Sequence, residues 1–253
     1  MIKKFFIICG LILSLSLVNA GTTDPSIDDS KYIQYGQKFE YVGKIHGIAK
    51  DKKMFYGSCV AHTKNIVLTA AHIANDIDSA NITINNKTFK IIKSIPHPLF
   101  NNLGRNYDIA ICLVEGDIDL DWFPPLYKKH DELNKICCMA GYGVTGKFNS
   151  SKRTDDQKRR AGSNKIDSVQ ENILTCNASK NNKTELEFLI SHGDSGGGLF
   201  IDGHLAGINS SIEQIFINSI LQNDYRTTSS HVRISNHIDW IENTIKSLNN
   251  QEK

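Results

Sequence analysis

Three short segments of this 253-residue sequence contain the residue types that nucleophilic catalysis requires. The run Thr69-Ala70-Ala71-His72 ends an apolar stretch at a histidine, and Tyr107-Asp108-Ile109-Ala110 places a carboxylate at the start of another. The third segment, Gly193-Asp194-Ser195-Gly196-Gly197, sets a serine among glycines. We take the histidine, the aspartate and the serine as candidate catalytic residues.

A serine hydroxyl becomes a good nucleophile only when a base removes its proton, and histidine has a suitable pKa for that task. The imidazole in turn needs a buried carboxylate, which fixes its tautomer and stabilises its transient positive charge. The glycines allow a tight turn in which the amides of Gly193 and Ser195 can bind a developing oxyanion. The three segments together predict acyl transfer by Ser195, with His72 as the base and Asp108 as the orienting carboxylate.

Each segment alone has an ordinary structural explanation. A histidine after small residues is more often structural, aspartates at strand starts often cap turns, and Gly-rich serine loops are often simple turns. Asp117, Asp119 and Asp121 also compete with Asp108 for the role of the carboxylate. The occurrence of all three segments in one chain is what favours catalysis.

Short apolar runs, alternating or β-branched and separated by polar turns, make up most of the chain and predict an all-β protein. A polar, Pro-containing segment at 115–131 interrupts them, so we expect one β unit over residues 36–120 and a second over 121–233. Apolar residues spaced by three and four over residues 234–253 predict a C-terminal amphipathic helix and tail. The predicted strands are 41–48, 58–61, 66–69, 80–84, 89–92, 109–114, 136–140, 168–174, 185–190, 199–201, 204–210 and 231–234.

The N-terminus predicts an export signal. Lys3 and Lys4 form a basic start, residues 5–18 are apolar, and Val18-Asn19-Ala20 fits a signal peptidase site. An apolar run of 14 residues is short for a membrane span. We therefore expect a signal peptide over residues 1–20, no membrane association after its removal, and a secreted or periplasmic protein. Residues 21–35 form an N-terminal segment and a candidate pro-segment.

Composition excludes several classes of function. The chain has 29 basic and 27 acidic residues, and loss of the two signal lysines balances them, so we expect no nucleic-acid partner. The basic stretch 147–160 contains two aspartates and favours a solvated loop. No Cys-x-x-Cys or His-x-x-x-His pair suggests a metal site, and we expect no metal and no cofactor. An odd number of cysteines remains after signal removal, with open pairing: Cys59, Cys112, Cys137, Cys138 and Cys176.

The three motifs resemble those of the chymotrypsin-like, trypsin-fold serine endopeptidases. Secondary landmarks agree over about residues 41–241, including His97-Pro98, Ala140-Gly141-Tyr142-Gly143 and Asp239-Trp240-Ile241. The resemblance implies two six-stranded antiparallel β-barrels with the active site between them. It also implies a serine endopeptidase that forms an acyl-enzyme, acts on proteins or peptides and can meet a protein inhibitor. We expect a monomer.

Two departures from that family concern disulfides and activation. Ile73 and Ser191 stand where many relatives have cysteines, so the chain is most similar to the disulfide-poor bacterial or phage members. Relatives are often activated when a new N-terminus, commonly Ile-Val-Gly-Gly, pairs with the aspartate before the serine, here Asp194. That tetrapeptide is absent, and Ile33 lies near the expected place. Ile33 is therefore a candidate for the new terminus.

The resemblance also places a primary specificity pocket. Leu189 is expected at its floor, Ser210 is expected to hold Asp108 and line the pocket, and Ile212 and Ser229 replace glycines that often keep it open. An aliphatic floor cannot pair with Lys or Arg, so we expect cleavage after small or medium apolar residues rather than trypsin-like specificity.

Two other functions stay open. A catalytically silent homologue could serve as a binding module, since an intact set of three residues does not guarantee an assembled oxyanion hole. The serine motif also fits the Gly-x-Ser-x-Gly pattern of esterases, which need a helix directly after the serine. Here the apolar run after Gly196-Gly197-Gly198 predicts a strand, which makes the esterase the weaker alternative.

Overall fold

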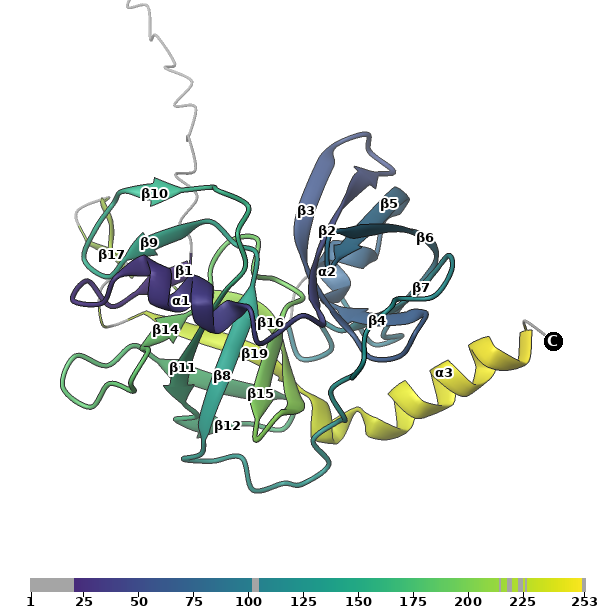
Figure 1. Ribbon diagram of the computed structural model, residues 1–253. Helices are drawn as coiled ribbons and strands as arrows, with labels where there is room; N and C mark the ends of the chain where they lie inside the picture. Colours follow the sequence, from purple (N-terminus) through teal and green to yellow (C-terminus); the bar gives the residue numbers. More distant parts are fainter. Residues whose placement is uncertain are drawn as a thin grey trace, which may run out of the picture.

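The computed structural model describes residues 21–101, 105–213, 215–217, 220–222, 225 and 227–251. The predicted signal peptide, residues 1–20, lies outside the described residues. Two β units lie side by side, and a long helix at the C-terminal end of the chain extends along the first of them (Figure 1). The prediction of an all-β protein with a C-terminal helix is confirmed.

The first unit is a closed barrel with the strand order β2-β3-β4-β7-β6-β5. Its core consists of branched apolar side chains such as Ile45, Val60, Leu68, Ile82 and Ile111, all fully buried. Such side chains pack well on a pleated surface, so the short apolar runs become strands. Its strands are β2 (Val42–Ala49), β3 (Met54–Ala61), β4 (Ile66–Thr69), β5 (Ile77–Ile84), β6 (Lys87–Pro96) and β7 (Ala110–Val114).

The second unit is built on a seven-stranded sheet with the order β11-β8-β15-β16-β19-β13-β12. This sheet forms a half-barrel, where the sequence led us to expect a closed one. A separate core fills it, with Met139, Phe188 and Leu199 among its buried members. Its strands are β8 (Ile136–Gly141), β11 (Arg160–Lys165), β12 (Ser168–Val169), β13 (Ile173–Asn177), β15 (Gly198–Ile201), β16 (His204–Glu213) and β19 (Thr228–Arg233).

A smaller four-stranded sheet with the order β10-β9-β1-β14 lies against the half-barrel. Its strand β1 pairs with β9 in parallel and with β14 antiparallel, so the first described residues are inserted between two later segments (Figure 1). The strands are β1 (Gly21–Thr23), β9 (Thr145–Lys147), β10 (Arg153–Thr154) and β14 (Phe188–Leu189), and a separate hairpin joins β17 (Ile215–Ile217) to β18 (Ile220–Gln222).

The sequence predicted neither the short helix α2 (Ala71–Ala74) nor the longer helix α1 (Asp29–Gly36). Helix α1 buries only Tyr32 and Gly36, so it has no apolar stripe that a periodicity argument could detect. Its start has a recognisable cap, because the Asp28 side chain accepts a hydrogen bond of 2.9 Å from the Ser30 amide. The remaining helical segments are α2 (Ala71–Ala74), the 3₁₀ turn η1 (Ile234–Asn236) and the C-terminal α3 (Ile238–Gln251).

The expected solvated loop over residues 147–160 is wrong at its C-terminal end. Arg160 is buried, and it forms ion pairs with Asp29 at 2.6 Å and with Asp156 at 2.8 Å. Arg159 donates a hydrogen bond of 2.8 Å to a backbone carbonyl at the end of α1. These arginines fasten α1 to the start of β11, a role that charge pattern alone does not reveal.

All five cysteines of the described residues are free thiols, and Cys137 Sγ lies 3.7 Å from Cys176 Sγ in the second core. No helix in the described part of the chain is long and apolar enough to cross a membrane.

A buried histidine lies within the half-barrel. His231, on β19, donates from Nδ1 to Asn209 Oδ1 at 2.9 Å, and its Nε2 lies 3.0 Å from Ser229 Oγ. Burial lowers the pKa of His231 from 6.5 to about 3. The folded protein therefore keeps this imidazole neutral at pH values where the unfolded chain protonates it.

We expect His231 to reduce stability in mild acid. Its contribution to the free energy of unfolding is complete above pH 6.5 and is lost as the pH falls from 6.5 toward about 3. In that window the loss is about 1.4 kcal/mol for each pH unit. Urea unfolding of the parent and of His231→Gln at several pH values checks this. The parent should lose stability more steeply, and equal pH slopes would contradict the prediction.

Candidate active site

His72 and Asp108 come together because the strands beside them pair. The last residue of β4, Thr69, lies opposite Ala110 at the start of β7, so the residues just beyond each strand share one edge of the barrel. His72 Nδ1 donates to Asp108 Oδ2 at 2.7 Å, and the His72 backbone amide donates to Oδ1 at 2.8 Å. The carboxylate thus fixes both the ring and the main chain of the histidine.

Asp108 is fully buried, and both its oxygens accept hydrogen bonds. Ser210 Oγ donates to Oδ2 at 2.6 Å, and Arg105 Nη1 donates to the same oxygen at 3.1 Å. Burial alone would raise the pKa of Asp108, but hydrogen bonds from His72 and Ser210 bring it below its ordinary value. The carboxylate therefore stays ionised and can stabilise an imidazolium.

Ser195 lies in the loop before β15, and Ser210 connects it to the other two residues. Ser195 Oγ donates to the Ser210 carbonyl at 3.5 Å, while the Ser210 side chain reaches Asp108. Among the described residues, Ser195 Oγ makes no hydrogen bond to His72. The structure thus brings all three candidates to one place and leaves the serine hydroxyl turned toward a main-chain acceptor.

Ser58, on the first barrel, holds the serine loop in position. Its amide donates to the Ser195 carbonyl at 2.8 Å, and its hydroxyl donates to the Gly193 carbonyl at 2.8 Å. Gly196 has a φ of +86°, and a Cβ there would collide with Thr69 Oγ1 and the Ser58 carbonyl. The loop can therefore approach the first barrel only because this residue is glycine.

The peptide between His192 and Gly193 has the orientation that an oxyanion site needs. The His192 carbonyl accepts a hydrogen bond of 3.1 Å from the Val144 amide. Because a trans peptide is planar, the Gly193 N–H points to the opposite side. Within the described residues, neither the Gly193 amide nor the Ser195 amide donates to any group. Both donors are thus available to a ligand oxygen.

The residues expected in the specificity pocket are only partly brought together. Ile212 and Ser229 lie opposite each other on β16 and β19, close in register to Ser210. Leu189 is fully buried in β14, where it pairs with β1 in the second core. His192 is exposed, and its ring meets Tyr56 edge-on at 5.5 Å between centroids.

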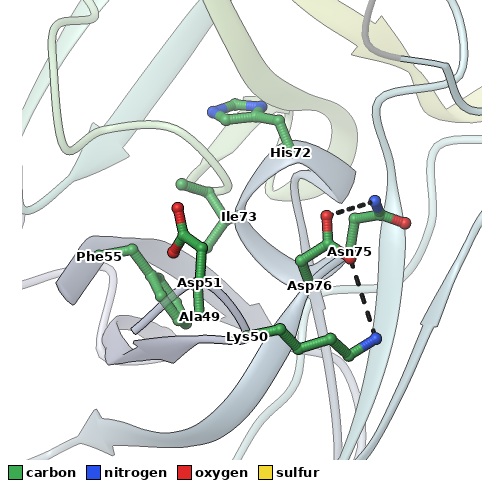
Figure 2. A pocket seen from close by; sticks show the side chains of 8 residues that line it. All are labelled: Ala49, Lys50, Asp51, Phe55, His72, Ile73, Asn75 and Asp76. Atoms are coloured by element: carbon green, nitrogen blue, oxygen red, sulfur yellow. Dashed lines mark hydrogen bonds and ion pairs between the residues drawn. The ribbon is translucent and has the colours of Figure 1, made fainter. Parts of the chain in front are cut away.

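A cavity of about 400 Å³ adjoins the exposed side of His72. Phe55 and Ile73 give it apolar walls, and Asp51 and Asp76 add carboxylates at its rim (Figure 2). In Figure 2 the Asp51 carboxylate lies beside Ile73, the His72 ring lies above them, and the Asp76 carboxylate contacts Asn75 and Lys50. The cavity is large enough to hold a substrate side chain next to the His72 imidazole.

Comparison with known proteins decides the family. A family model described as trypsin matches residues 35–241, most of the chain. The chain belongs to the trypsin family. It is a serine endopeptidase, a hydrolase that acts on protein substrates, as the sequence motifs indicated.

Individual relatives are distant. Chymase of Canis lupus familiaris is 25% identical over 211 residues, which cover 72% of this chain and 76% of chymase. The solved structure of neuropsin, a serine protease expressed in the limbic system of mouse brain, matches with a TM-score of 0.65 and 18% identity over 83% of this chain and 96% of neuropsin. HL collagenase matches with a TM-score of 0.66 and 16% identity over 82% of this chain and 94% of its own. At such identities the structural likeness shows the fold alone.

The trypsin fold removes one alternative function. Strand β15 follows the Ser195 loop directly, where the Gly-x-Ser-x-Gly esterases require a helix. The esterase alternative is therefore wrong for this chain. In the described residues, no cluster of three or more His, Cys, Asp or Glu side chains could hold a metal ion.

Two residues of the site were missed in the sequence. Ser58 follows a glycine in an apolar run and gives no sign of its contacts with the distant serine loop. Arg105 lies three residues before Asp108, a spacing that could have suggested an ion pair. Its guanidinium group places a positive charge next to Asp108, in addition to the imidazolium that forms on His72 during the reaction.

We expect Arg105→Gln to lower kcat/KM several-fold at neutral pH. The substitution removes one of the hydrogen-bond donors to Asp108 Oδ2, the oxygen that also accepts from His72 Nδ1, so the carboxylate is held less firmly against the imidazole. The Arg105 side chain is 44% exposed, so solvent limits the loss to a small one. Lys87→Gln, which removes a charge paired with Asp119 on the surface, is the matched control. A kcat/KM equal to that of this control would contradict the prediction.

Proposed function

We propose that this chain is a secreted serine endopeptidase with Ser195 as nucleophile, His72 as general acid and base, and Asp108 as orienting carboxylate. The hydrogen bond from His72 Nδ1 to Asp108 carries the proposal, since the carboxylate favours the tautomer with its proton on Nδ1 and leaves Nε2 free to accept a proton. Rotation about the Ser195 Cα–Cβ bond releases the long bond to the Ser210 carbonyl and turns the hydroxyl toward Nε2.

The reaction then consists of two acyl transfers. Ser195 Oγ attacks the substrate carbonyl while Nε2 of His72 takes the hydroxyl proton, which then passes to the departing amine as the C–N bond breaks. Water attacks the acyl-enzyme next and gives its proton to the same nitrogen, which returns it to Oγ as the ester breaks. The amides of Gly193 and Ser195 stabilise the oxyanion in both steps, each by about 3 kcal/mol.

The surroundings of the site support a preference for apolar residues before the cut. Leu189 and Ile190 are buried side chains of the segment leading to Ser195, and Ile212 lies opposite Ser229 where β16 pairs with β19. No carboxylate among these residues could pair with a substrate Lys or Arg. The cavity beside His72 suits residues after the cut, because the imidazole must reach the departing amine.

Secretion, the monomeric state and susceptibility to a protein inhibitor belong to the same proposal. The basic start, apolar run and small-residue cleavage site of residues 1–20 support export. The nearly balanced charge argues against a nucleic-acid partner.

The proposal predicts that Ser195→Ala abolishes proteolysis. An unfolded protein mixture is digested by the chain Gly21–Lys253 and by the variant, and the products are analysed by mass spectrometry. The parent should cleave, and loss of the nucleophile should lower kcat by a factor on the order of 10⁶. Cleavage by both would place the nucleophile elsewhere. No cleavage by either, with no labelling by a fluorophosphonate probe, would favour the catalytically silent homologue.

The same digest predicts the residue before each cut. Small and medium apolar side chains should dominate at that position, because the residues that the resemblance assigns to the pocket, Leu189 and Ile212 among them, carry no charge. A product set dominated by Lys or Arg before the cut would contradict the assigned pocket while leaving the nucleophile in place.

A further inference from the structure

Two of the cysteines meet in the core of the second β unit. Cys137 Sγ lies 3.7 Å from Cys176 Sγ, although the two residues are 39 positions apart in the chain. Cys137 is 1% exposed and Cys176 is fully buried. In the described part of the chain, no other two thiols form a hydrogen bond with each other. The sequence left the pairing of the cysteines open, and the fold singles out this pair.

The three other cysteines of the described residues lie elsewhere. Cys138 follows Cys137 on β8, so its side chain lies on the opposite face of the strand, where its Sγ is 2.9 Å from Tyr35 Oη. Cys59 and Cys112 belong to the core that includes the first barrel. These three thiols therefore do not compete for a place in the pair.

The contact between the two sulfurs spans the open side of the half-barrel. Cys137 is on β8, next to the edge strand β11, and Cys176 is on β13, next to the opposite edge strand β12. Strand pairing among the described residues leaves these two ends of the seven-stranded sheet unjoined. A covalent bond between the two cysteines would tie the ends together and so close the second β unit.

We propose that the exported enzyme contains a disulfide bond between Cys137 and Cys176, which closes the second β unit. The inference rests on the proposed export, because secretory compartments are oxidising whereas the cytosol keeps thiols reduced. A disulfide bond is about 2.0 Å long, so the two sulfurs must approach by roughly 1.7 Å from their distance as thiols. Small rotations about the two Cα–Cβ bonds supply that approach.

The bond forms by two exchange steps with a disulfide of the compartment, carried by a thiol oxidoreductase or by oxidised glutathione. The thiolate of one cysteine attacks that disulfide, and a mixed disulfide forms as a thiolate of the oxidant leaves. The thiolate of the second cysteine then attacks the protein sulfur of the mixed disulfide and expels the remaining thiolate. The two cysteines lose two protons and two electrons, and the oxidant gains both.

This chemistry belongs to the time when the chain is still folding. The hydrogen bond with Cys176 and burial raise the pKa of the Cys137 thiol, so this thiol keeps its proton in the folded protein. Exchange requires a thiolate that the oxidant can reach, and the closed core offers none. The bond therefore forms before the second core closes, and the same burial then protects it from reduction.

The test uses two preparations of the protein. One is the full chain, expressed in an exporting bacterial host and recovered after secretion. The other is the chain Gly21–Lys253, unfolded with reductant and refolded in a mixture of oxidised and reduced glutathione. Each product is denatured without reductant, alkylated with iodoacetamide, digested with trypsin and analysed by mass spectrometry.

Trypsin should release residues 136–147 and 166–180 as two peptides that remain joined by a disulfide bond. Fragment spectra should place the bond on Cys137 and Cys176, and iodoacetamide should modify the three other cysteines, Cys59, Cys112 and Cys138. Alkylation of all five cysteines in both preparations, or a bond that joins Cys176 to any other cysteine, would overturn the proposal.

The two preparations separate this inference from the proposed function. A secreted protein that cleaves its substrates with all five thiols free would leave the proposed function standing and overturn the disulfide. A bond found in the refolded chain, in a protein that the host does not export, would confirm the disulfide and remove the proposed secretion.

Cys176→Ala and Cys112→Ala form a matched pair of variants, since each removes a fully buried thiol. Exported Cys112→Ala should keep the bond, and reduction in denaturant followed by refolding with reductant should lower its thermal midpoint by roughly 5 to 10 °C. The same treatment should leave the midpoint of Cys176→Ala unchanged. Equal responses of the two variants would overturn the role of the bond in closing the second β unit.

Discussion

Asp108 has no contact with water, and the arrangement of the site follows from how its charge is stabilised. Its hydrogen-bond donors come from the turn after β4, from the loop before β7 and from β16 of the half-barrel. A buried carboxylate with fewer donors would take a proton and could not support an imidazolium. Satisfying this one group therefore requires both β units to meet at this edge.

Hydrogen bonds to buried polar groups also hold the loop that carries Ser195 in place. Ser58 reaches across from the first barrel to two carbonyl groups of the loop, and Asp194 binds amides within and beside it. Between these two attachments, the amides of Gly193 and Ser195 donate to no group in the described part of the chain. Polar groups that are already oriented lose little on binding an oxyanion, which is the physical basis of their catalytic use.

Much of this could be predicted from the sequence, because local patterns carry it. The apolar runs predicted most of the strands, the three-and-four spacing predicted α3, and the motifs around His72, Asp108 and Ser195 predicted the family. Apart from Arg105, whose partner Asp108 is only three residues away, the failures have a common cause. Helix α1, the buried Arg160 and the bonds of Ser58 depend on partners more than a hundred residues away, and no local pattern encodes such contacts.

The sequence by itself determined the all-β class, the trypsin family and the chemical identity of the candidate residues, since side-chain type and short-range spacing are properties of the chain. Only the tertiary structure decided which groups meet: Arg105 and Ser210 donate to the buried carboxylate of Asp108, and the Gly143 and Ser191 amides donate to the buried carboxylate of Asp194. Those outcomes depend on strand pairing and burial. A charged side chain loses its hydration only when the chain folds around it, and only then does its stability depend on an oppositely charged or hydrogen-bonding partner.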